Sequence, residues 1–157
     1  MAYKKDNPGV YIPPPLIYLA FFFVAFPFQR WLPIPHAFFE SPAARAIGAI
    51  FILAGMSFGF PALIRFLKSG NTVVTIKPAS CLQTTGIYAL SRNPMYVSLM
   101  FFYTGFAFLF GNWWHFILTP FVFLVIQQYV IRREENYLYR RFGEDYMKYK
   151  GKVRRWI

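Results

Sequence analysis

The sequence predicts an all-α integral membrane protein with about four transmembrane helices and a cytoplasmic, amphipathic, helical C-terminal tail. Three observations lead to this fold class. Of the 157 residues, 57% are hydrophobic and 22% aromatic. These residues gather in four long blocks, and the lysines and arginines concentrate between and after the blocks. No linker or repeat divides the chain, so residues 1–157 are predicted to form a single membrane-embedded domain.

The four apolar blocks predict helices long enough to cross a bilayer. We expect these helices near residues 16–32, 46–66, 94–110 and 113–131. At about 1.5 Å per residue, the longer blocks reach roughly 28 Å, about one hydrocarbon core. Lys4 and Lys5 precede the first block, as in a signal peptide, but no small-residue cleavage site follows it, which favours a retained helix. Gly55 and Gly59 in the second block form a small-xxx-small pair, a weak sign of close helix packing.

The distribution of positive charge predicts the orientation. The formal net charge is +11, which in a soluble protein would suggest nucleic acid as a partner. Here all lysines and arginines except Arg30 and Arg45 fall on one side of a four-helix topology, together with both termini. The positive-inside rule makes that side cytoplasmic, and anionic lipid head groups account for most of the charge. We therefore expect a multi-pass protein of the cell membrane, the inner membrane in a bacterium, that contacts membrane lipids and no nucleic acid.

The sequence offers little for binding a metal. Cys81 is the only cysteine, which excludes an internal disulfide and a multi-cysteine metal site. The two histidines, His36 and His115, lie in segments predicted to be far from the basic loops. We expect no metal.

The connections after the third block predict how the last helices are arranged. The residues GNWWHF, 111–116, indicate a hairpin turn, because Gly and Asn tolerate left-handed backbone angles. Helices three and four are therefore expected to be antiparallel neighbours. In the tail, residues 132–157, Gly143 is a plausible helix stop. Aromatic and apolar residues then recur at helical spacing and predict a surface helix, at Tyr146, Tyr149, Val153 and Trp156. A simple electrostatic anchor is the alternative for this tail.

Two polar stretches are expected to meet at the cytoplasmic ends of helices three and four. One is GIYALSRNPMYVS, residues 86–98, and the other is RREENYLYRRF, residues 132–142. The acidic pair Glu134 and Glu135 would then face Arg92 and Asn93, which lie in the first stretch.

A purely structural role for the same residues stays open. Asn93 and Pro94 are suited to begin a helix, because proline is tolerated in the first turn. The residues RREE, 132–135, are also typical of a belt of long side chains at a membrane surface. Glu134 and Arg141 lie seven residues apart and therefore share one helical face, with Leu138 between them.

These stretches carry a resemblance to a known family. GIYALSRNPMY, followed later by EE, L, FG, Y, Y and a basic end, resembles the isoprenylcysteine carboxyl methyltransferases and related phospholipid methyltransferases. The resemblance covers roughly residues 72–157. In the eukaryotic form of the motif a histidine stands where this chain has Asn93, and a glycine where it has Ser98.

The resemblance implies a membrane-embedded methyltransferase that uses S-adenosylmethionine, held between the last helices and the tail. It implies catalytic roles for Glu134, Glu135 and Arg141. It implies that the cofactor contacts Tyr88, Arg92, Asn93, Pro94, Tyr96, Glu134, Glu135 and Leu138, with Phe142 and Tyr146 in the surrounding pattern. On separate grounds, the sequence has no strand followed by a Gly-rich loop, which argues against a Rossmann site.

The chemistry of methyl transfer suits these residue types. Displacement at a sulfonium needs the reactants fixed in line and their charges matched, with little acid-base help. A carboxylate can hold the cofactor's ammonium group, an arginine can hold a carboxylate, and tyrosine faces can surround the sulfur. The acceptor is expected to be an amphipathic or lipid-linked carboxylate or amine, and the choice between Glu134 and Glu135 stays open. The alternatives are a nicotinamide-dependent membrane reductase and a non-catalytic membrane anchoring or interaction protein.

Overall fold

The computed structural model describes residues 7–71 and 77–157, and in that part of the chain every regular element is helical and none is a strand. The elements are, in order, α1 (Pro14–Trp31), η1 (Ala37–Glu40), α2 (Pro42–Lys68), η2 (Gly86–Ala89), α3 (Pro94–Phe110), α4 (Trp113–Val125), η3 (Ile126–Ile131) and α5 (Arg132–Lys152). The helices α1 to α4 overlap the four predicted ranges, so the helical content expected from the apolar blocks is confirmed.

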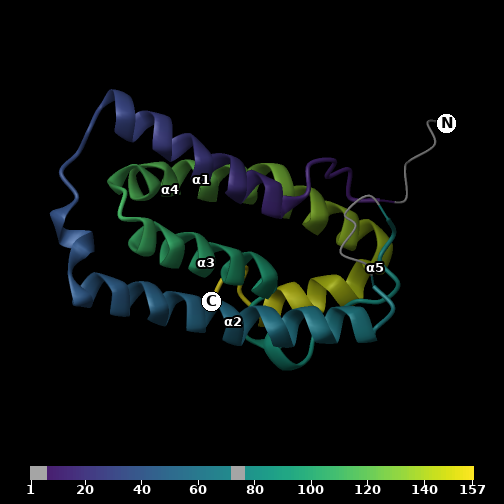
Figure 1. Cartoon of the computed structure of the whole chain (residues 1–157). Helices are drawn as coiled ribbons and strands as arrows, with labels where there is room; N and C mark the ends of the chain where they lie inside the picture. Colours follow the sequence, from purple (N-terminus) through teal and green to yellow (C-terminus); the bar gives the residue numbers. More distant parts are fainter. Residues whose placement is uncertain (1–6, 72–76) are drawn as a thin grey trace.

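The four main helices lie roughly parallel or antiparallel in a bundle (Figure 1). Helix α1 lies beside α4, and α3 lies between this pair and α2. The start of α1, the end of α2 and the start of α3 lie at one end of the bundle, here called the polar end. The hairpin between α3 and α4 and the connection through η1 lie at the other end.

Glycines bring α2 and α3 into close contact. A Cβ atom on Gly105 would lie 2.9 Å from the carbonyl oxygen of Gly48, and one on Gly59 would lie 2.5 Å from Ser98 Oγ. The Ser98 hydroxyl donates a hydrogen bond of 2.7 Å to the carbonyl oxygen of Gly55. The close packing predicted from Gly55 and Gly59 is therefore confirmed, and it extends along the helix to Gly48.

The outer surfaces of these helices are apolar. Within residues 7–71 and 77–157, two helical stretches are long and apolar enough to cross a membrane, Pro42–Lys68 and Trp113–Lys152, and Pro94–Phe110 is a shorter apolar helix. Only 17% of the most apolar stretch of α2 is buried, and Ile50, Leu53 and Phe60 project outward from it. Large apolar side chains exposed along a whole helix are typical of a surface that meets lipid.

The predicted hairpin between α3 and α4 is present. Gly111, with φ 65°, ends α3 in the left-handed region that glycine adopts easily. The Asn112 side chain accepts a hydrogen bond of 2.9 Å from the backbone N–H of Trp114 and so caps α4. Its amide also donates to the carbonyl oxygen of Ala25, 3.0 Å away, which ties the hairpin to α1.

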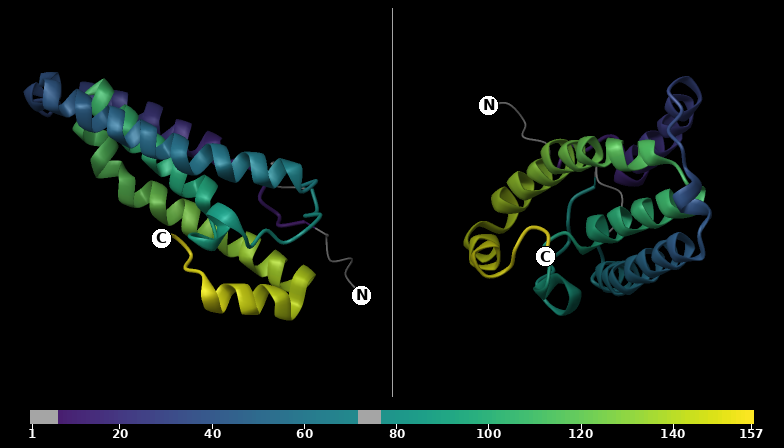
Figure 2. Two further views of the ribbon diagram at one scale, coloured as in Figure 1. Left: turned by 90° about the horizontal axis from the view of Figure 1, so that it is seen from below. Right: turned by 90° about the vertical axis from the view of Figure 1, so that its left-hand side faces the viewer.

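Helix α4 continues through the π-helical segment η3 into α5, which breaks at Gly143. There φ is 53°, and the chain turns so that residues 144–152 run back toward the bundle (Figure 2). The stop predicted at Gly143 is confirmed. The prediction that Val153 and Trp156 continue the surface helix is wrong: α5 ends at Lys152, Val153 has extended backbone, and Trp156 stacks on Phe123 with ring centroids 4.9 Å apart.

Candidate active site

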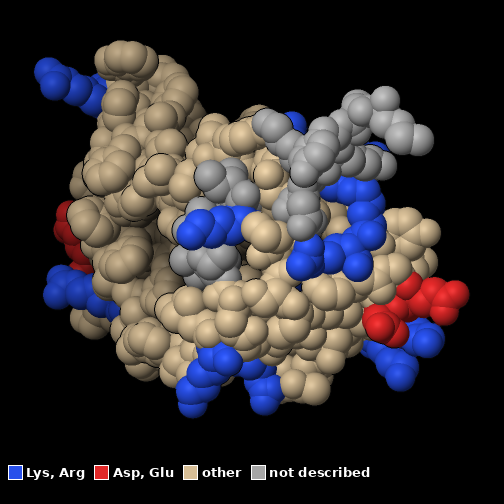
Figure 3. Space-filling model, turned by 90° about the vertical axis from the view of Figure 1, so that its right-hand side faces the viewer, with Lys and Arg blue, Asp and Glu red and all other residues tan. Residues whose placement is uncertain are grey.

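A cavity of about 570 Å³ lies at the polar end of the bundle. Its walls come from α2, α3 and α5, from the loop before η2, and from prolines at the start of α1. The residues expected to bind a cofactor all line it, namely Tyr88, Arg92, Asn93, Pro94, Tyr96, Glu134, Glu135 and Leu138. The two polar stretches therefore do meet. Lys and Arg side chains gather over this end of the molecule (Figure 3).

The loop before α3 is held in place by contacts from outside it. Pro94 occupies the first turn of α3, as a helix-starting role predicts. The Asn93 side chain makes no capping hydrogen bond; instead its amide donates to the carbonyl oxygen of Arg155, 2.8 Å away. The hydroxyl of Tyr149 donates to the carbonyl oxygen of Tyr88, 2.6 Å away. Both contacts come from the C-terminal part of the chain, so this part shapes the cavity wall.

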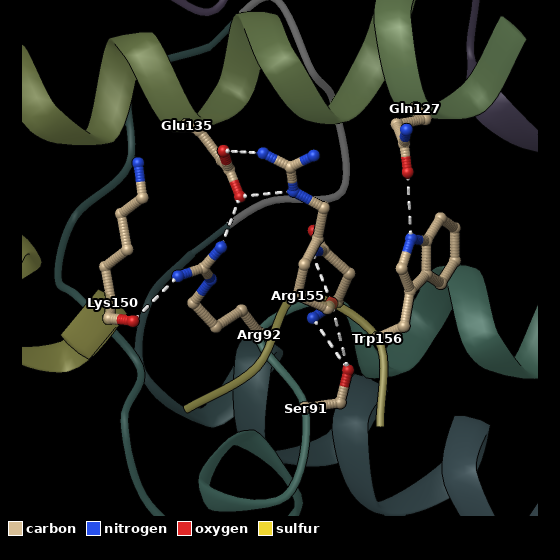
Figure 4. A network of polar contacts seen from close by, with 8 residues as sticks. Ser91, Arg92, Gln127, Glu135, Lys150, Arg155 and Trp156 are labelled. Atoms are coloured by element: carbon tan, nitrogen blue, oxygen red, sulfur yellow. Dashed lines mark hydrogen bonds and ion pairs between the residues drawn. The ribbon is translucent and has the colours of Figure 1, made fainter. Parts of the chain in front are cut away.

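Glu135 is the centre of a network of ion pairs (Figure 4). Its carboxylate accepts from Arg92 Nη2 at 2.7 Å, and from Arg155 Nε and Nη2 at 3.0 and 2.7 Å. Glu135 is only 8% exposed. Arg92 also donates from Nη1 to the carbonyl oxygen of Lys150, 3.1 Å away. Charge-assisted hydrogen bonds of this kind are stronger than neutral ones, and they also hold the guanidinium groups in defined orientations.

The surroundings keep Glu135 ionised. Burial by itself would raise the pKa of this carboxyl group. The hydrogen bonds from Arg155 and the positive charges of Arg92, Arg155 and Lys150 lower the pKa by more than burial raises it. The pKa of Glu135 therefore lies below its ordinary value. Since its negative charge is already balanced, Glu135 is poorly suited to attract a second cation.

Glu134 has a different environment one residue earlier in the chain. Among the described residues, its carboxylate accepts a hydrogen bond from the Tyr96 hydroxyl at 2.7 Å and has no cationic partner. Burial raises the pKa of Glu134 to about 7, while the hydrogen bond from Tyr96 opposes that rise. A carboxylate that lines a cavity without a countercharge is a candidate for binding a cation.

Arg141 does not line the cavity. Its side chain is exposed, and its guanidinium carbon lies 5.9 Å from the centre of the Phe142 ring. Arg141 does follow Glu134 by seven residues, but these carry it about 10 Å along the helix axis, whereas Leu138, one turn after Glu134, still reaches the cavity. The structure thus leaves Arg141 and Phe142 outside the group that it brings together.

Two residues that sequence reasoning missed contribute to this site. Tyr149 lines the cavity, and Arg155, the third residue from the end of the chain, binds Glu135. The three-residue spacing from Tyr146 places Tyr149 on the same helical face, but spacing alone does not distinguish a face that meets lipid from one that lines a cavity. Arg155 sits in a basic run whose charge alone suggested only lipid contact.

The sequence matches known proteins across most of this region. The profile of the phospholipid methyltransferase family matches residues 43–145. An uncharacterized protein of Haemophilus influenzae is 41% identical over 63 residues, which are 40% of this chain and the whole of that protein.

A second relative has an assigned activity. Protein-S-isoprenylcysteine O-methyltransferase of Schizosaccharomyces pombe is 32% identical over 108 residues, which are 66% of this chain and 44% of the yeast enzyme. No solved structure matches the chain significantly. The family profile covers α2 through the first part of α5, and with them most of the cavity wall but not the prolines at the start of α1, Tyr146 or Tyr149. The chain belongs to the phospholipid methyltransferase family of membrane proteins.

Proposed function

We propose that the protein transfers a methyl group from S-adenosylmethionine to an amphipathic or lipid-linked carboxylate or amine at the cytoplasmic surface of the membrane. The observation that carries this proposal is the cavity at the polar end, where the two motifs of the family meet. Membership of the family supports methyl transfer in general. The methyl donor and the class of acceptor are proposed from the resemblance of the two motifs, with support from the residues that line the cavity.

Two polar groups in the cavity wall fit the amino acid end of S-adenosylmethionine. Glu134 presents a carboxylate with no cationic partner in the described part of the chain, and would hold the ammonium group. The Nε atom of Arg92 is buried and has no hydrogen-bond partner among the described residues, and a ligand carboxylate would satisfy it. Glu135 would act by fixing the Arg92 guanidinium rather than by touching the ammonium group.

The remaining wall suits a cationic, partly apolar ligand. The bound cofactor supplies a methyl group on a positively charged sulfur, and that charge is lost as the methyl group passes to the acceptor. The rings of Tyr88, Tyr96 and Tyr146 line the cavity and offer aromatic faces to the positive charge. Little acid-base help is needed, so positioning supplies most of the rate enhancement.

The apolar wall supports an acceptor that comes from the bilayer. Met56, Phe60 and Leu63 of α2 line the cavity and are also exposed on the outer surface, where Phe60 is 55% exposed. The same residues would contact both lipid and an acceptor chain. An acceptor with an apolar chain would therefore reach the polar end without leaving the membrane.

Cofactor binding tests the proposal first. S-adenosylhomocysteine should raise the thermal unfolding midpoint of the full-length protein in detergent, whereas a nicotinamide nucleotide should not. Glu134→Gln should weaken the binding of S-adenosylmethionine about tenfold to a hundredfold, because one charge-assisted hydrogen bond is lost. Glu144→Gln is the matched control, since Glu144 is exposed on the same helix and does not line the cavity. Equal binding by parent and Glu134→Gln would refute the assigned role of Glu134.

The acceptor class has a separate test. Purified protein with labelled S-adenosylmethionine should transfer label to membrane-partitioning amines or carboxylates in preference to short, soluble analogues with the same nucleophile. Transfer to the soluble analogues alone would contradict acceptor access from the bilayer.

The side of the membrane can be tested with the only thiol. Cys81 lines the cavity, so a membrane-impermeant maleimide should label it only after the cells are permeabilised. Labelling in intact cells would place the cavity on the opposite side from the one proposed.

A further inference from the structure

The last five residues of the chain, Val153–Ile157, dock against the candidate site, and we refer to them as the C-terminal clasp. The backbone N–H of Arg92 donates to the carbonyl oxygen of Arg154, 3.0 Å away. The Asn93 amide and the Ser91 hydroxyl donate to the carbonyl oxygen of Arg155, at 2.8 and 3.4 Å. The clasp thus holds three consecutive residues of the loop that begins α3, and Figure 4 shows Ser91 beside Arg155.

Trp156 anchors the clasp to the bundle. Its ring stacks on Phe123 of α4, with centroids 4.9 Å apart and planes 28° apart. Its indole N–H donates to Gln127 Oε1, 3.2 Å away. Gln127 lies in η3, where the π-helical turn changes the direction of side chains relative to a regular α-helix. The anchor fixes the clasp to α4 and η3.

Arg155 then completes the charge balance at Glu135. It contributes two of the three guanidinium contacts to this carboxylate, from a side chain that is itself one-third exposed. Without Arg155, Arg92 would be the only arginine paired with the buried Glu135 carboxylate. The carboxylate would then be less firmly oriented, and it would no longer hold the Arg92 guanidinium in one orientation. Buried ion pairs that lose one partner are costly because the remaining charge stays desolvated.

From this geometry we infer that Arg155 is a positioning residue of the methyltransferase site, acting through Glu135 on Arg92, and that the C-terminal clasp is part of the site. This inference rests on the proposed function. The family profile ends at residue 145, so the match does not include the clasp. Arg155 would not touch the cofactor; it would keep Glu135 ionised and correctly oriented.

The charged and titratable groups that face Glu135 set its pKa and so allow a pH-dependent test of the inference. They are Arg92 before α3, Tyr146 and Lys150 of α5, and Arg155 of the clasp, while Glu134 acts on Tyr146. Removing Arg155 takes away hydrogen bonds that offset the effect of burial on the Glu135 carboxyl group, so the pKa of Glu135 should rise. The variant should then lose ionised Glu135 at a higher pH than the parent does.

The experiment compares Arg155→Gln with Arg154→Gln in the full-length protein in detergent. Both changes remove one positive charge, but the Arg154 side chain is exposed and only its backbone contacts the site. We expect Arg155→Gln to weaken S-adenosylhomocysteine binding about tenfold near neutral pH, and the deficit to widen as the pH falls toward about 5. Arg154→Gln should bind like the parent, and Arg155→Lys, which keeps the charge, should recover part of the affinity.

Two outcomes would overturn the inference: parent-like affinity in Arg155→Gln, or a deficit that is the same at every pH. If the parent itself does not bind S-adenosylhomocysteine, the proposed function fails. The clasp is then tested by unfolding without ligand. Arg155→Gln should lower the unfolding midpoint near neutral pH more than Arg154→Gln does, with the gap closing as Glu135 is protonated. Equal midpoints for the two variants would overturn the clasp as well.

Discussion

The polar end of the molecule and the seam between α2 and α3 are held together by opposite means. At the polar end, arginines from the loop before α3 and from the clasp converge on the buried Glu135 of α5. Along the seam, glycines let the two backbones approach so closely that a Cβ on Gly105 would lie 2.9 Å from the Gly48 carbonyl oxygen. The polar end is held by oriented hydrogen bonds between charged groups, whereas the seam is held by close packing where glycines have no side chain.

This difference follows from the surroundings of each region. In contact with lipid, apolar side chains gain little by leaving the solvent, so close packing must hold the helices together. At the membrane surface, polar groups can be arranged around a cavity and still reach water. The two regions should therefore respond differently to substitution, and the following predictions are given from the largest expected loss of stability to the smallest, followed by one gain.

The largest effect is expected at Glu135. Glu135→Gln removes the charge shared by Arg92 and Arg155, and Arg92 is too buried to regain its hydration. We expect a loss of about 3 kcal/mol in the free energy of unfolding. Thermal or denaturant unfolding in detergent measures this, with Glu144→Gln as the exposed control on the same helix. A loss no greater than that of the control would mean that the ion pairs of Glu135 do not stabilise the fold.

The seam should respond to the addition of one methyl group. Gly105→Ala places a carbon 2.8 Å from a side-chain carbon of Ile52 and 2.9 Å from the Gly48 carbonyl oxygen. The helices must separate, which should cost about 1–3 kcal/mol of unfolding free energy. Gly151→Ala is the control, because a Cβ there meets nothing within 4 Å. Equal unfolding free energies for the two glycine variants would contradict the dependence of the seam on close packing.

Asn93 tests whether the loop before α3 needs its bond to the clasp. Asn93→Leu removes the donor to the Arg155 carbonyl oxygen and should cost about 1–2 kcal/mol together with part of the cofactor affinity. Asn93→His keeps a donor and restores the residue of the eukaryotic motif, so it should retain binding. Equal affinity of the two variants in a titration with S-adenosylhomocysteine would show that this hydrogen bond is dispensable.

Among these changes only the replacement of Glu134 should raise the stability of the protein, so it comes last. Its pKa of about 7 lies above the ordinary 4.5, so its contribution to stability is present at low pH and is lost as the pH rises through about 7. Glu134→Gln cannot ionise. It should match the parent near pH 4, below the ordinary pKa, and exceed its unfolding free energy by on the order of 3 kcal/mol near pH 8. Unfolding midpoints at both pH values check this, and a variant that is less stable than the parent at the higher pH would contradict the unpaired state of Glu134.

Adjacent residues in this chain thus have different tasks that their spacing does not reveal. Helical periodicity places Glu134 and Glu135 about 100° apart on α5, but it does not say which of them faces two arginines. That depends on Arg155, which is twenty residues away and reaches Glu135 only because the chain reverses at Gly143. The same reversal turns Tyr146 and Tyr149 toward the cavity instead of toward lipid.

The sequence by itself determined the helices, their order, the hairpin at Gly111 and Asn112, and the meeting of the two family motifs, because these follow from apolar blocks, turn residues and short connections. Only the tertiary structure decided which glutamate is paired, that Arg141 lies outside the cavity, and that the chain end forms a clasp. Local patterns fix backbone conformation over a few turns of helix. Charge pairing between distant segments depends on where the chain bends, and at Gly143 a single residue with φ 53° sets that direction.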